Sequence, residues 1–311
     1  MSATTVFAVG GNALAPAGGL ADSAQRLRAR EVAEQIVAIS ETGRRVLVVH
    51  GNGPQVGALA IAQEAVSREL PPQPLFVLGA MTQGQLGYLL SEAIASIQCE
   101  RGGERGIAAI VTRVLVDEAD PAFSSPSKPI GPFFPEGRAR RLAAARGWAV
   151  AEDAGRGWRR VVASPRPIEV LERDEISALL AKEKIVIACG GGGVPVARRD
   201  DSFVGVDAVI DKDLSAALIG RLVGAETLLL LTGVDEVMLD FGTPEQTPVD
   251  RLTVAEARRH LAEGQFPAGS MGPKIAAAAS FVEGGGIQAV ITSLKHGAEG
   301  LEGLAGTRIV A

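Results

Sequence analysis

Three clusters of glycine each follow a short aliphatic run, a placement that suits the binding of an anion. Gly10-Gly11-Asn12 follows residues 6–9, Gly51-Asn52-Gly53 follows a run that ends at His50, and four glycines at 190–193 follow residues 184–189. In parallel α/β sheets, ligands bind beyond the carboxyl ends of the strands. Glycine lets backbone N–H groups approach an anion closely, and a following helix adds the positive end of its dipole. We therefore expect these loops to hold phosphate or carboxylate.

The common phosphate-binding templates do not account for these loops. The pattern G-x-x-x-x-G-K-[ST] is absent, and Gly51, Gly53 and Gly57 give G-x-G-x-x-x-G, one position longer than the dinucleotide fingerprint. Any one cluster could be only a tight turn after a strand. Three clusters in equivalent positions favour binding, by a phosphate chemistry of another kind.

Three lysines stand where this chain would ordinarily use arginine. The sequence has 31 Lys and Arg residues, and only six of them are lysines. Lys128 lies in a proline-rich segment, Lys212 lies at the start of a helical pattern, and Lys274 ends a glycine-rich turn. A compact ammonium can follow a phosphoryl group in transfer, whereas a guanidinium imposes a flat fork. These lysines predict a site for phosphoryl transfer.

Two aspartates flank Lys212 and allow two interpretations. Asp211 could orient two ammonium groups by hydrogen bonding and keep them protonated. Alternatively, Asp211 and Asp213 form only a solvated, aspartate-capped first turn of a helix. We favour this second interpretation for Asp213 but not for Lys212.

Other catalytic chemistries find little support. The three histidines are scattered and neither H-E-x-x-H nor C-x-x-C occurs, so we expect no metal held by protein side chains alone. Ser125 and Lys128 have S-x-x-K spacing, but Pro126 and Pro129 prevent the helix on which that pair works. His50 is expected to be a structural residue at a strand end.

Alternating strands and helices must position these residues. Buried strands are predicted at 6–9, 45–49, 108–116, 184–189, 227–232 and 288–293, and helices at 22–41, 54–68, 83–99, 172–183, 211–224, 253–263 and 273–284. The alternation predicts a three-layer α/β/α fold with a mostly parallel central sheet. A hydrophobic content of 47% with only 4% aromatic residues suits an aliphatic core of this kind.

The length of 311 residues predicts two lobes, at 1–183 and 184–311. Residues 117–167 interrupt the alternation, because they hold seven of the 17 prolines and both tryptophans. We expect an inserted, lid-like subdomain there, with a stiff extended loop at 124–134. A variable surface excursion is the alternative.

Composition limits the partners and the compartment. No apolar run reaches the ~18 residues of a membrane span, and the chain opens on no apolar leader. Cys99 and Cys189 do not suggest a disulfide framework, which favours a reducing cytoplasm. A net charge of -5 argues against nucleic acid as a partner.

The motifs together resemble those of the carbamate kinases, of the amino acid kinase superfamily, nearly end to end. The similar segments are AVGGNAL (8–14), VVHGNGPQVG (48–57), LGAMTQGQLGYLL (78–90), SKPIGPFF (127–134), GRGWRRVVASPRP (155–167), IVIACGGGGVPV (185–196), VDAVIDKDLSAAL (206–218) and GSMGPK (269–274). Other branches of the superfamily place a lysine just before the first glycine pair, where this chain has Ala8-Val9. The lysine of the inserted subdomain is expected to supply that charge.

The resemblance implies reversible phosphoryl transfer between ATP and carbamate, giving ADP and carbamoyl phosphate, with Mg²⁺ bridging the phosphates. It also implies a cytoplasmic homodimer, with helices 54–68 and 83–99 the first candidates for its interface, and ATP formation at the end of arginine breakdown. A small acid other than carbamate as acceptor remains an alternative, and so does a non-catalytic relative that senses nucleotide.

By the same resemblance, the residues expected to hold carbamate and the transferred group are Gly10, Gly11, Asn12, Gly51, Asn52 and Gly53. Lys128 would reach in from the inserted subdomain, Lys212 would stabilise the moving phosphoryl group, and Asp211 would organise the lysines. Nucleotide binding is expected from Lys212, Thr232, Met271, Gly272 and Lys274. Gly233 and Met238 depart from the usual family pattern and leave the nucleotide preference open.

Overall fold

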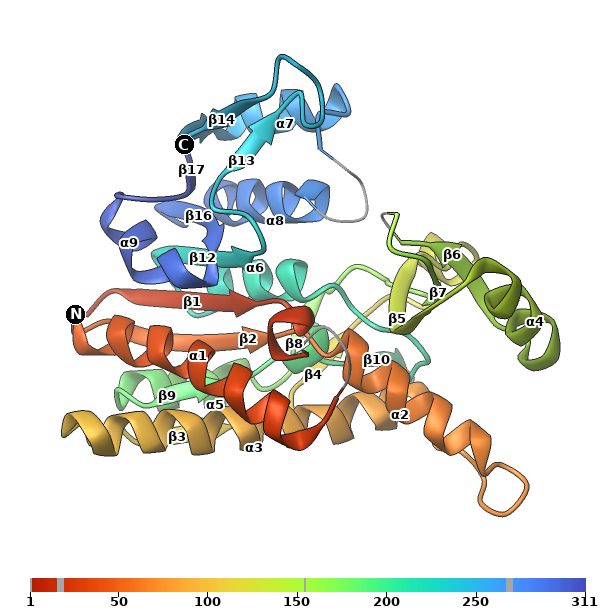
Figure 1. Cartoon of the computed structure of the whole chain (residues 1–311). Helices are drawn as coiled ribbons and strands as arrows, with labels where there is room; N and C mark the ends of the chain where they lie inside the picture. Colours follow the sequence, from red (N-terminus) through yellow and green to blue (C-terminus); the bar gives the residue numbers. More distant parts are fainter. Residues whose placement is uncertain (1, 16–19, 154, 267–270) are drawn as a thin grey trace.

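The computed structural model describes residues 2–15, 20–153, 155–266 and 271–311. Its largest sheet has eight strands in the order β15-β17-β16-β12-β1-β2-β9-β3 (Figure 1). The strands are β1 (Thr4–Val9), β2 (Arg45–His50), β3 (Ile107–Ala109), β9 (Ile185–Ile187), β12 (Thr227–Thr232), β15 (Arg251–Thr253), β16 (Gln288–Ser293) and β17 (Thr307–Val310). Every neighbouring pair is parallel except β16 with β17. The mostly parallel sheet predicted from the sequence is confirmed.

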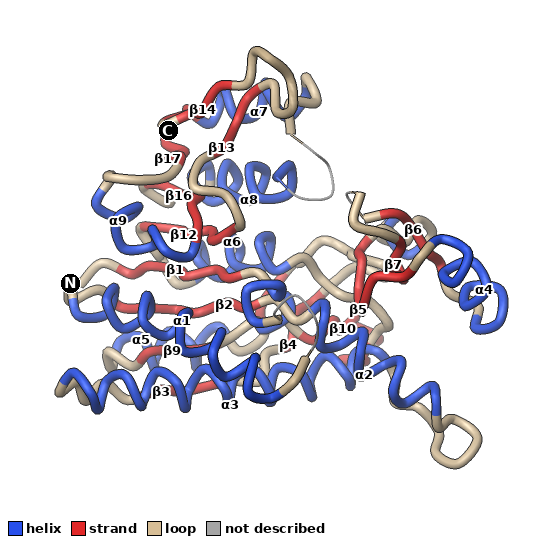
Figure 2. Tube along the Cα trace, viewed as in Figure 1, coloured by secondary structure: helices blue, strands red, loops and turns tan. Residues whose placement is uncertain are grey.

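Helices cover both faces of this sheet (Figure 2). They are α1 (Asp22–Glu41), α2 (Gly53–Ala65), α3 (Leu75–Arg101), α4 (Glu136–Arg146), α5 (Arg173–Ala181), α6 (Lys212–Leu222), α7 (Val254–Ala262), α8 (Met271–Glu283) and α9 (Gly297–Glu302). Successive residues of a strand point to opposite faces. In β1, Phe7 and Val9 therefore pack with α1 and α3, while Val6 and Ala8 pack with α5, α6 and α8. These two apolar layers enclose the sheet and make the three-layer fold.

The stretch 108–116, predicted as one strand, is divided between two sheets. Residues 107–109 form β3 of the large sheet, whereas β4 (Arg113–Leu115) lies in a four-stranded sheet of order β11-β10-β4-β8. The division falls at Thr112, whose N–H and C=O bond to the side chain of Gln83 on α3, at 2.8 and 3.2 Å. The carbonyl also accepts the N–H of Val194 in β10, at 2.8 Å, so the chain leaves β9 at this point and joins the second sheet.

The other strands of the small sheets are β8 (Glu169–Val170), β10 (Val194–Arg199) and β11 (Ser202–Gly205), while β13 (Val237–Leu239) pairs with β14 (Thr247–Val249). Strand β9 lies between β2 and β3, and β10 pairs with β4. Strand β12 also pairs with β1, so the large sheet runs through both halves of the chain. The boundary between the two lobes at residue 183 stays a prediction.

A separate three-stranded sheet, ordered β5-β7-β6, forms the body of the inserted subdomain. Its elements are β5 (Lys128–Phe134), α4, β6 (Ala149–Glu152) and β7 (Trp158–Val162). The proline-rich segment is extended, as predicted, but residues 128–134 of it form a strand rather than a loop. Strand β5 lies at the edge of its sheet, which is where a strand tolerates proline because the missing N–H is not needed for pairing.

The described helices include none that is both long enough and apolar enough to cross a membrane.

Candidate active site

Three glycine loops meet at the carboxyl ends of β1, β2 and β9. A Cβ atom on Gly51 would lie 2.5 Å from the backbone nitrogen of Gly11, and one on Gly191 would lie 2.2 Å from Nδ2 of the Asn52 side chain. A side chain at Gly51 would displace the backbone of the first loop, and one at Gly191 would displace the Asn52 amide. The glycines are therefore required by the packing of the loops as well as by access to a ligand.

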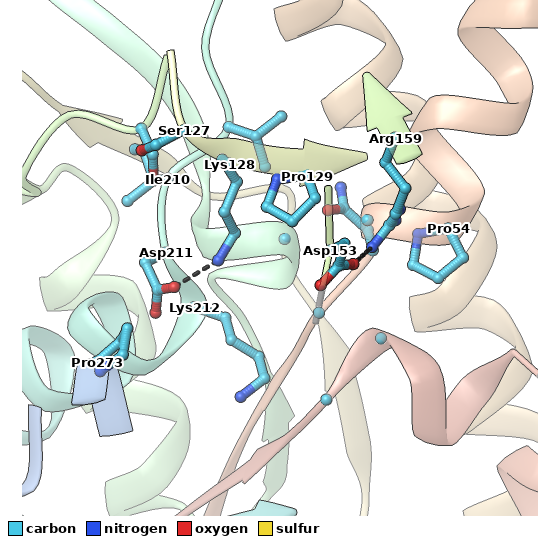
Figure 3. Close-up of a pocket in the computed structure, with 18 of the residues that line it drawn as sticks. Pro54, Ser127, Lys128, Pro129, Asp153, Arg159, Ile210, Asp211, Lys212 and Pro273 are labelled. Atoms are coloured by element: carbon cyan, nitrogen blue, oxygen red, sulfur yellow. Dashed lines mark hydrogen bonds and ion pairs between the residues drawn. The ribbon is translucent and has the colours of Figure 1, made fainter. Parts of the chain in front are cut away.

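A cavity of about 480 Å³ opens at this junction (Figure 3). Its lining includes the predicted residues Gly10, Gly11, Gly51, Asn52, Gly53, Lys128, Asp211 and Lys212. The side chain of Asn12 lies outside the described part of the structure. The amide of Asn52 donates to the hydroxyl of Thr82, at 2.8 Å, which fixes its orientation in the wall. Helix α2 begins at Gly53, so its positive dipole end faces the cavity.

Lys128 crosses from the inserted subdomain to the second lobe. Its ammonium pairs with Oδ2 of Asp211, as Figure 3 shows. The other oxygen of Asp211 caps α6 by accepting the N–H of Asp213, at 2.8 Å. One carboxylate thus joins the subdomain to the first turn of α6.

Asp213 connects the other two lysines, so the interpretation of this residue as a solvated capping aspartate is wrong. Its side chain is buried, with the residue 3% exposed. One carboxylate oxygen pairs with Lys212, and the other accepts from Lys274 at 2.8 Å. Asp211, which the sequence led us to expect in this role, pairs with Lys128 alone. Three ammonium groups and two carboxylates therefore form one connected group.

The sequence contains a signal for this burial. Asp213 stands three, four and seven residues before Ala216, Ala217 and Gly220, all of which are buried on α6. Residues at this spacing share a face of a helix. An aspartate on the buried face needs a cationic partner, since an unpaired buried charge is costly.

Burial and charge set the protonation of this group. Burial lowers the pKa of Lys212 to about 8, and the neighbouring Asp213 opposes the shift. Burial raises the pKa of Asp213, but Lys212 and Lys274 outweigh it and hold the value below the usual range. Lys128 has the same effect on the pKa of Asp211. The pKa of Lys274 is raised, because the attraction of Asp213 exceeds the effect of burial.

Two arginines on the opposite wall are site residues for which the sequence suggested no role. Arg159, 5% exposed, donates to the carbonyl of Gly131 at 3.0 Å and to Asp153 at 2.9 Å. Arg156 also lines the cavity and pairs with Asp153 at 3.1 Å. The lining holds Lys128, Lys212, Arg156 and Arg159 against Asp153 and Asp211. With Lys274 and Asp213 included, five cations face three carboxylates. The excess of two positive charges suits a polyanionic ligand although the chain as a whole is acidic.

A second, apolar pocket of about 270 Å³ lies in the second lobe. It is lined by Thr232, Gly233, Val234, Glu236, Met238, Phe241, Phe266 and Met271. The first turn of α8 connects the two cavities, since Met271 lines the apolar pocket and Pro273 lines the charged cavity. Gly272 is buried between them. An apolar pocket beside a cationic cavity has the layout that a nucleotide requires, with a flat base and a charged phosphate chain.

His50 is buried and takes no part in the charged cavity. Its Nδ1 lies 3.1 Å from the carbonyl oxygen of Gly51, and burial lowers its pKa to about 4. The ring is therefore neutral at physiological pH, in keeping with the structural role expected from the sequence.

The described residues include no group of three or more His, Cys, Asp or Glu side chains able to hold a metal ion. The two carboxylates of the cavity are each paired with cations, Asp211 with Lys128 and Asp153 with arginines. A divalent cation in this cavity would therefore take most of its ligands from a bound phosphate chain and water, as Mg²⁺ commonly does.

Comparison with known proteins gives a consistent result. The model of the Amino acid kinase family matches residues 3–293. A carbamate kinase of Thermococcus kodakarensis is 46% identical over 309 residues, which are 98% of each chain.

Solved structures agree with this match. A carbamate kinase from Giardia lamblia bound to citric acid superposes with a TM-score of 0.94 at 39% identity, over 99% of this chain and 98% of that one. The same enzyme bound to AMP-PNP gives a TM-score of 0.89 with the same coverage.

Proposed function

The chain belongs to the amino acid kinase family, among its carbamate kinases, and we propose that it transfers a phosphoryl group reversibly between ATP and carbamate. The products are ADP and carbamoyl phosphate. The observation that carries the proposal is the connected group of Lys128, Asp211, Lys212, Asp213 and Lys274 at the junction of a charged and an apolar cavity. Cations drawn from both lobes can share one phosphoryl group there.

The reaction needs charge neutralisation more than proton transfer. A carbamate oxygen attacks the γ-phosphorus of ATP, the new O–P bond forms, and the bond from that phosphorus to the β,γ-bridging oxygen breaks. Charge on the moving group spreads over its three equatorial oxygens. Carbamate is already anionic, so no general base is required. The neutral, buried His50 is compatible with this requirement.

Each cation has a place in this scheme. The stem of Lys212 runs beside the glycine loops, and a Cβ on Gly51 would lie 3.3 Å from its Cδ. Its ammonium is thus available to the group in transfer between the loops and the nucleotide. Lys128 meets the same group from the subdomain, and Lys274 lies on the nucleotide side. The loops at residues 10–12 and 51–53 hold carbamate and the transferred group by their backbone N–H groups.

The nucleotide enters as its Mg²⁺ complex. The base occupies the apolar pocket that contains Thr232 and Met271, and the phosphates extend past Gly272 toward Lys274 and Lys212. Mg²⁺ bound to the phosphate chain would neutralise part of its charge during transfer. The bound AMP-PNP of the Giardia lamblia relative supports an adenine nucleotide as the co-substrate.

The test is ATP formation from ADP, Mg²⁺ and carbamoyl phosphate, with purified wild type, Lys212→Ala and Lys128→Ala. Both variants should lose at least about 100-fold in kcat, since each removes a charge that stabilises the transition state. The exposed Lys182 provides a matched control, and Lys182→Ala should retain wild-type activity. Full activity in a cavity variant removes that lysine from the mechanism.

Two alternatives are separated by further measurements. An ADP-release measurement with a panel of small carboxylic acids identifies an acceptor other than carbamate. Nucleotide binding without turnover of any acceptor indicates a sensing role. The intact lysine and aspartate group favours catalysis over sensing, because binding alone does not require three ammonium groups around one position.

Assembly as a homodimer is part of the proposal. Helix α3 exposes Met81 and Tyr88, which are 47% and 58% exposed, and Val111, which follows β3, is exposed as well. The opposing helix α2 is less available, because the inserted subdomain packs on it. A second copy would bury the α3 surface. Tyr88→Glu should shift the mass measured by light scattering toward the monomer, whereas an unchanged dimer mass excludes this face.

We further propose that the enzyme works in the cytoplasm, toward ATP, at the end of arginine breakdown. Free Cys99 and Cys189 suit a reducing compartment. Gene deletion followed by growth on arginine as the energy source tests the pathway, and normal growth of the deletion strain excludes it.

A further inference from the structure

Helix α2 and the inserted subdomain project from the same side of the molecule (Figure 1), and two contacts join them. The first is a backbone contact between Gly57 of α2 and Gly131 of β5. A Cβ on Gly57 would lie only 1.9 Å from the nitrogen of Gly131. Buried apolar side chains surround this contact, among them Val56, Ile130 and Val162. The two elements cannot approach each other more closely here.

The second contact lies at the far end of α2 and is centred on Glu64. Its carboxylate accepts from Arg160 at 2.9 Å, from Arg146 at 3.1 Å and from the indole N–H of Trp148 at 3.3 Å. Both guanidinium groups also lie over the ring of Trp148, at 5.1 and 5.2 Å from its centroid. We call these four residues the Glu64 clamp.

The clamp is directly connected to the strands that carry the active-site cations. Arg160 lies in β7, where the adjacent Arg159 lines the charged cavity. Two residues further along β7, Val162 pairs with Lys128 of β5. The clamp holds the face of β7 that carries Arg160, while the opposite face carries Arg159 and faces the cavity. A change in the angle of this small sheet therefore moves Lys128.

The glycine contact gives the small sheet a fixed point beside α2, and Arg160 of the clamp pairs with Ile130, which is two residues from Lys128 along β5. Glu64 is seven residues from Gly57 along the helix, or about 10 Å at 1.5 Å per residue. Lys128 is three residues from Gly131 along the strand, also about 10 Å at 3.3 Å per residue. Glu64 and Lys128 are thus at similar distances from the glycine contact. A rotation of the subdomain about this contact that displaces the clamp by about 1 Å therefore displaces Lys128 by a similar amount. A misplacement of about 1 Å can lower a rate about 100-fold.

We propose that Glu64 is a positioning residue for phosphoryl transfer, acting by holding the subdomain at the angle that places the ammonium of Lys128 beside Asp211. This inference rests on the proposed function, in which Lys128 touches the transferred group. Glu64 itself lies outside the lining of the charged cavity. Its effect on the reaction passes through the sheet of the subdomain.

The first experiment measures kcat/KM for ATP formation in Glu64→Ala and Glu64→Gln. Glu64→Ala should lose about 10- to 100-fold. Glu64→Gln should lose less, because the amide oxygen still accepts one hydrogen bond. The matched control is Glu69→Ala, which removes the same charge from an exposed position just beyond α2 and should stay within about twofold of wild type. Affinity for MgADP, measured by calorimetry, should be unchanged, since the apolar pocket lies in the other lobe.

A double-mutant cycle with Lys128→Ala separates positioning from a general structural role. If Glu64 acts through Lys128, then Glu64→Ala should cause less than a twofold further loss in the Lys128→Ala background. A loss as large as that in the wild-type background overturns the proposal.

Hydrogen exchange gives a readout that does not depend on catalysis. The amides of residues 128–134 and 158–162 should exchange faster in Glu64→Ala, while those of β1 and β2 remain as protected as in wild type. If Glu64→Ala does not fold, activity and hydrogen exchange are both measured on Glu64→Gln. Unchanged exchange together with unchanged activity overturns the role of the clamp. A wild-type protein that makes no ATP overturns the proposed function instead, and the exchange result then tests the clamp alone.

Discussion

Asp213→Asn is the substitution that tests the charge arrangement of the site most directly. The change keeps the shape of the side chain but removes the negative charge that Lys212 and Lys274 share. Two unit charges about 4 Å apart interact by about 4 kcal/mol at an effective dielectric constant of about 20. Since one pKa unit corresponds to 1.36 kcal/mol, the loss of this attraction should lower the pKa of Lys212 from about 8 to about 5.

The consequence for activity follows from the protonated fraction of Lys212. At pH 7.5 an ammonium with a pKa of about 8 is about three-quarters protonated, whereas one with a pKa of about 5 is protonated in about 0.3% of molecules. The initial rate of ATP formation should therefore fall on the order of 100-fold. It should recover about tenfold when the pH is lowered to 6.5, because that change restores protonation.

The assay is luminescent detection of ATP at several pH values, with Asp120→Asn as the control. Like Asp213, Asp120 accepts two hydrogen bonds, but from the backbone N–H groups of Ala122 at 2.8 Å and Arg166 at 2.9 Å, and it does not line the cavity. The control should remain within about twofold of wild type. The reasoning is refuted if Asp213→Asn keeps more than a third of wild-type activity, or if its loss is the same at every pH.

Three further outcomes are expected. In the wild type, log kcat/KM should fall with a slope approaching -1 as the pH rises above about 8, because Lys212 loses its proton there. A flat profile to pH 9.5 would show that activity does not require the protonated form of Lys212. Gly51→Ala should lower kcat/KM at least about 100-fold, because its Cβ would lie 2.5 Å from the backbone of Gly11. Gly79→Ala, with open space around its Cβ, is the control and should be active. Equal activities of the two variants exclude a requirement for the close loop contact. Met238→Glu places a charge in the apolar pocket, so it should raise the KM for ADP at least about tenfold and leave the KM for carbamoyl phosphate unchanged. An unchanged KM for ADP would show that the base does not bind in this pocket.

The strands and helices that the sequence predicted well are those with a strong local hydrophobic signal. β1, β2 and β12 are buried on both faces and appear in the sequence as unbroken aliphatic runs. The run at 108–116 is also mostly apolar, with Thr112 and Arg113 as its only polar residues, and it is split at Thr112. The cause is the side chain of Gln83, which is 29 residues away in the sequence. A hydrogen bond over that separation leaves no trace in local hydrophobicity.

The candidate site divides in the same way. The glycine loops could be predicted because they follow strands, where a parallel sheet binds its ligands. Lys212 could be predicted because it is one of only six lysines and lies at the start of a helical pattern. The burial of Asp213 and the pairing of Arg159 with Asp153 depend on how separate elements pack together. The Glu64 clamp joins residues 82 to 96 positions apart in the chain. Such pairs become visible only when the fold is known.

The touching glycines at 57 and 131 also restrict the routes by which this protein can change. Because both residues already have the smallest possible side chain, a replacement at one cannot be offset by shrinking the other. A library randomised at both positions should return glycine at both among its active members. The residues of the Glu64 clamp, by contrast, have larger side chains, so a change in the charge or size of one of them can be offset by a change in another. The attachment of the subdomain can therefore vary in evolution around Glu64, at the far end of α2, but not at the contact of Gly57 with Gly131.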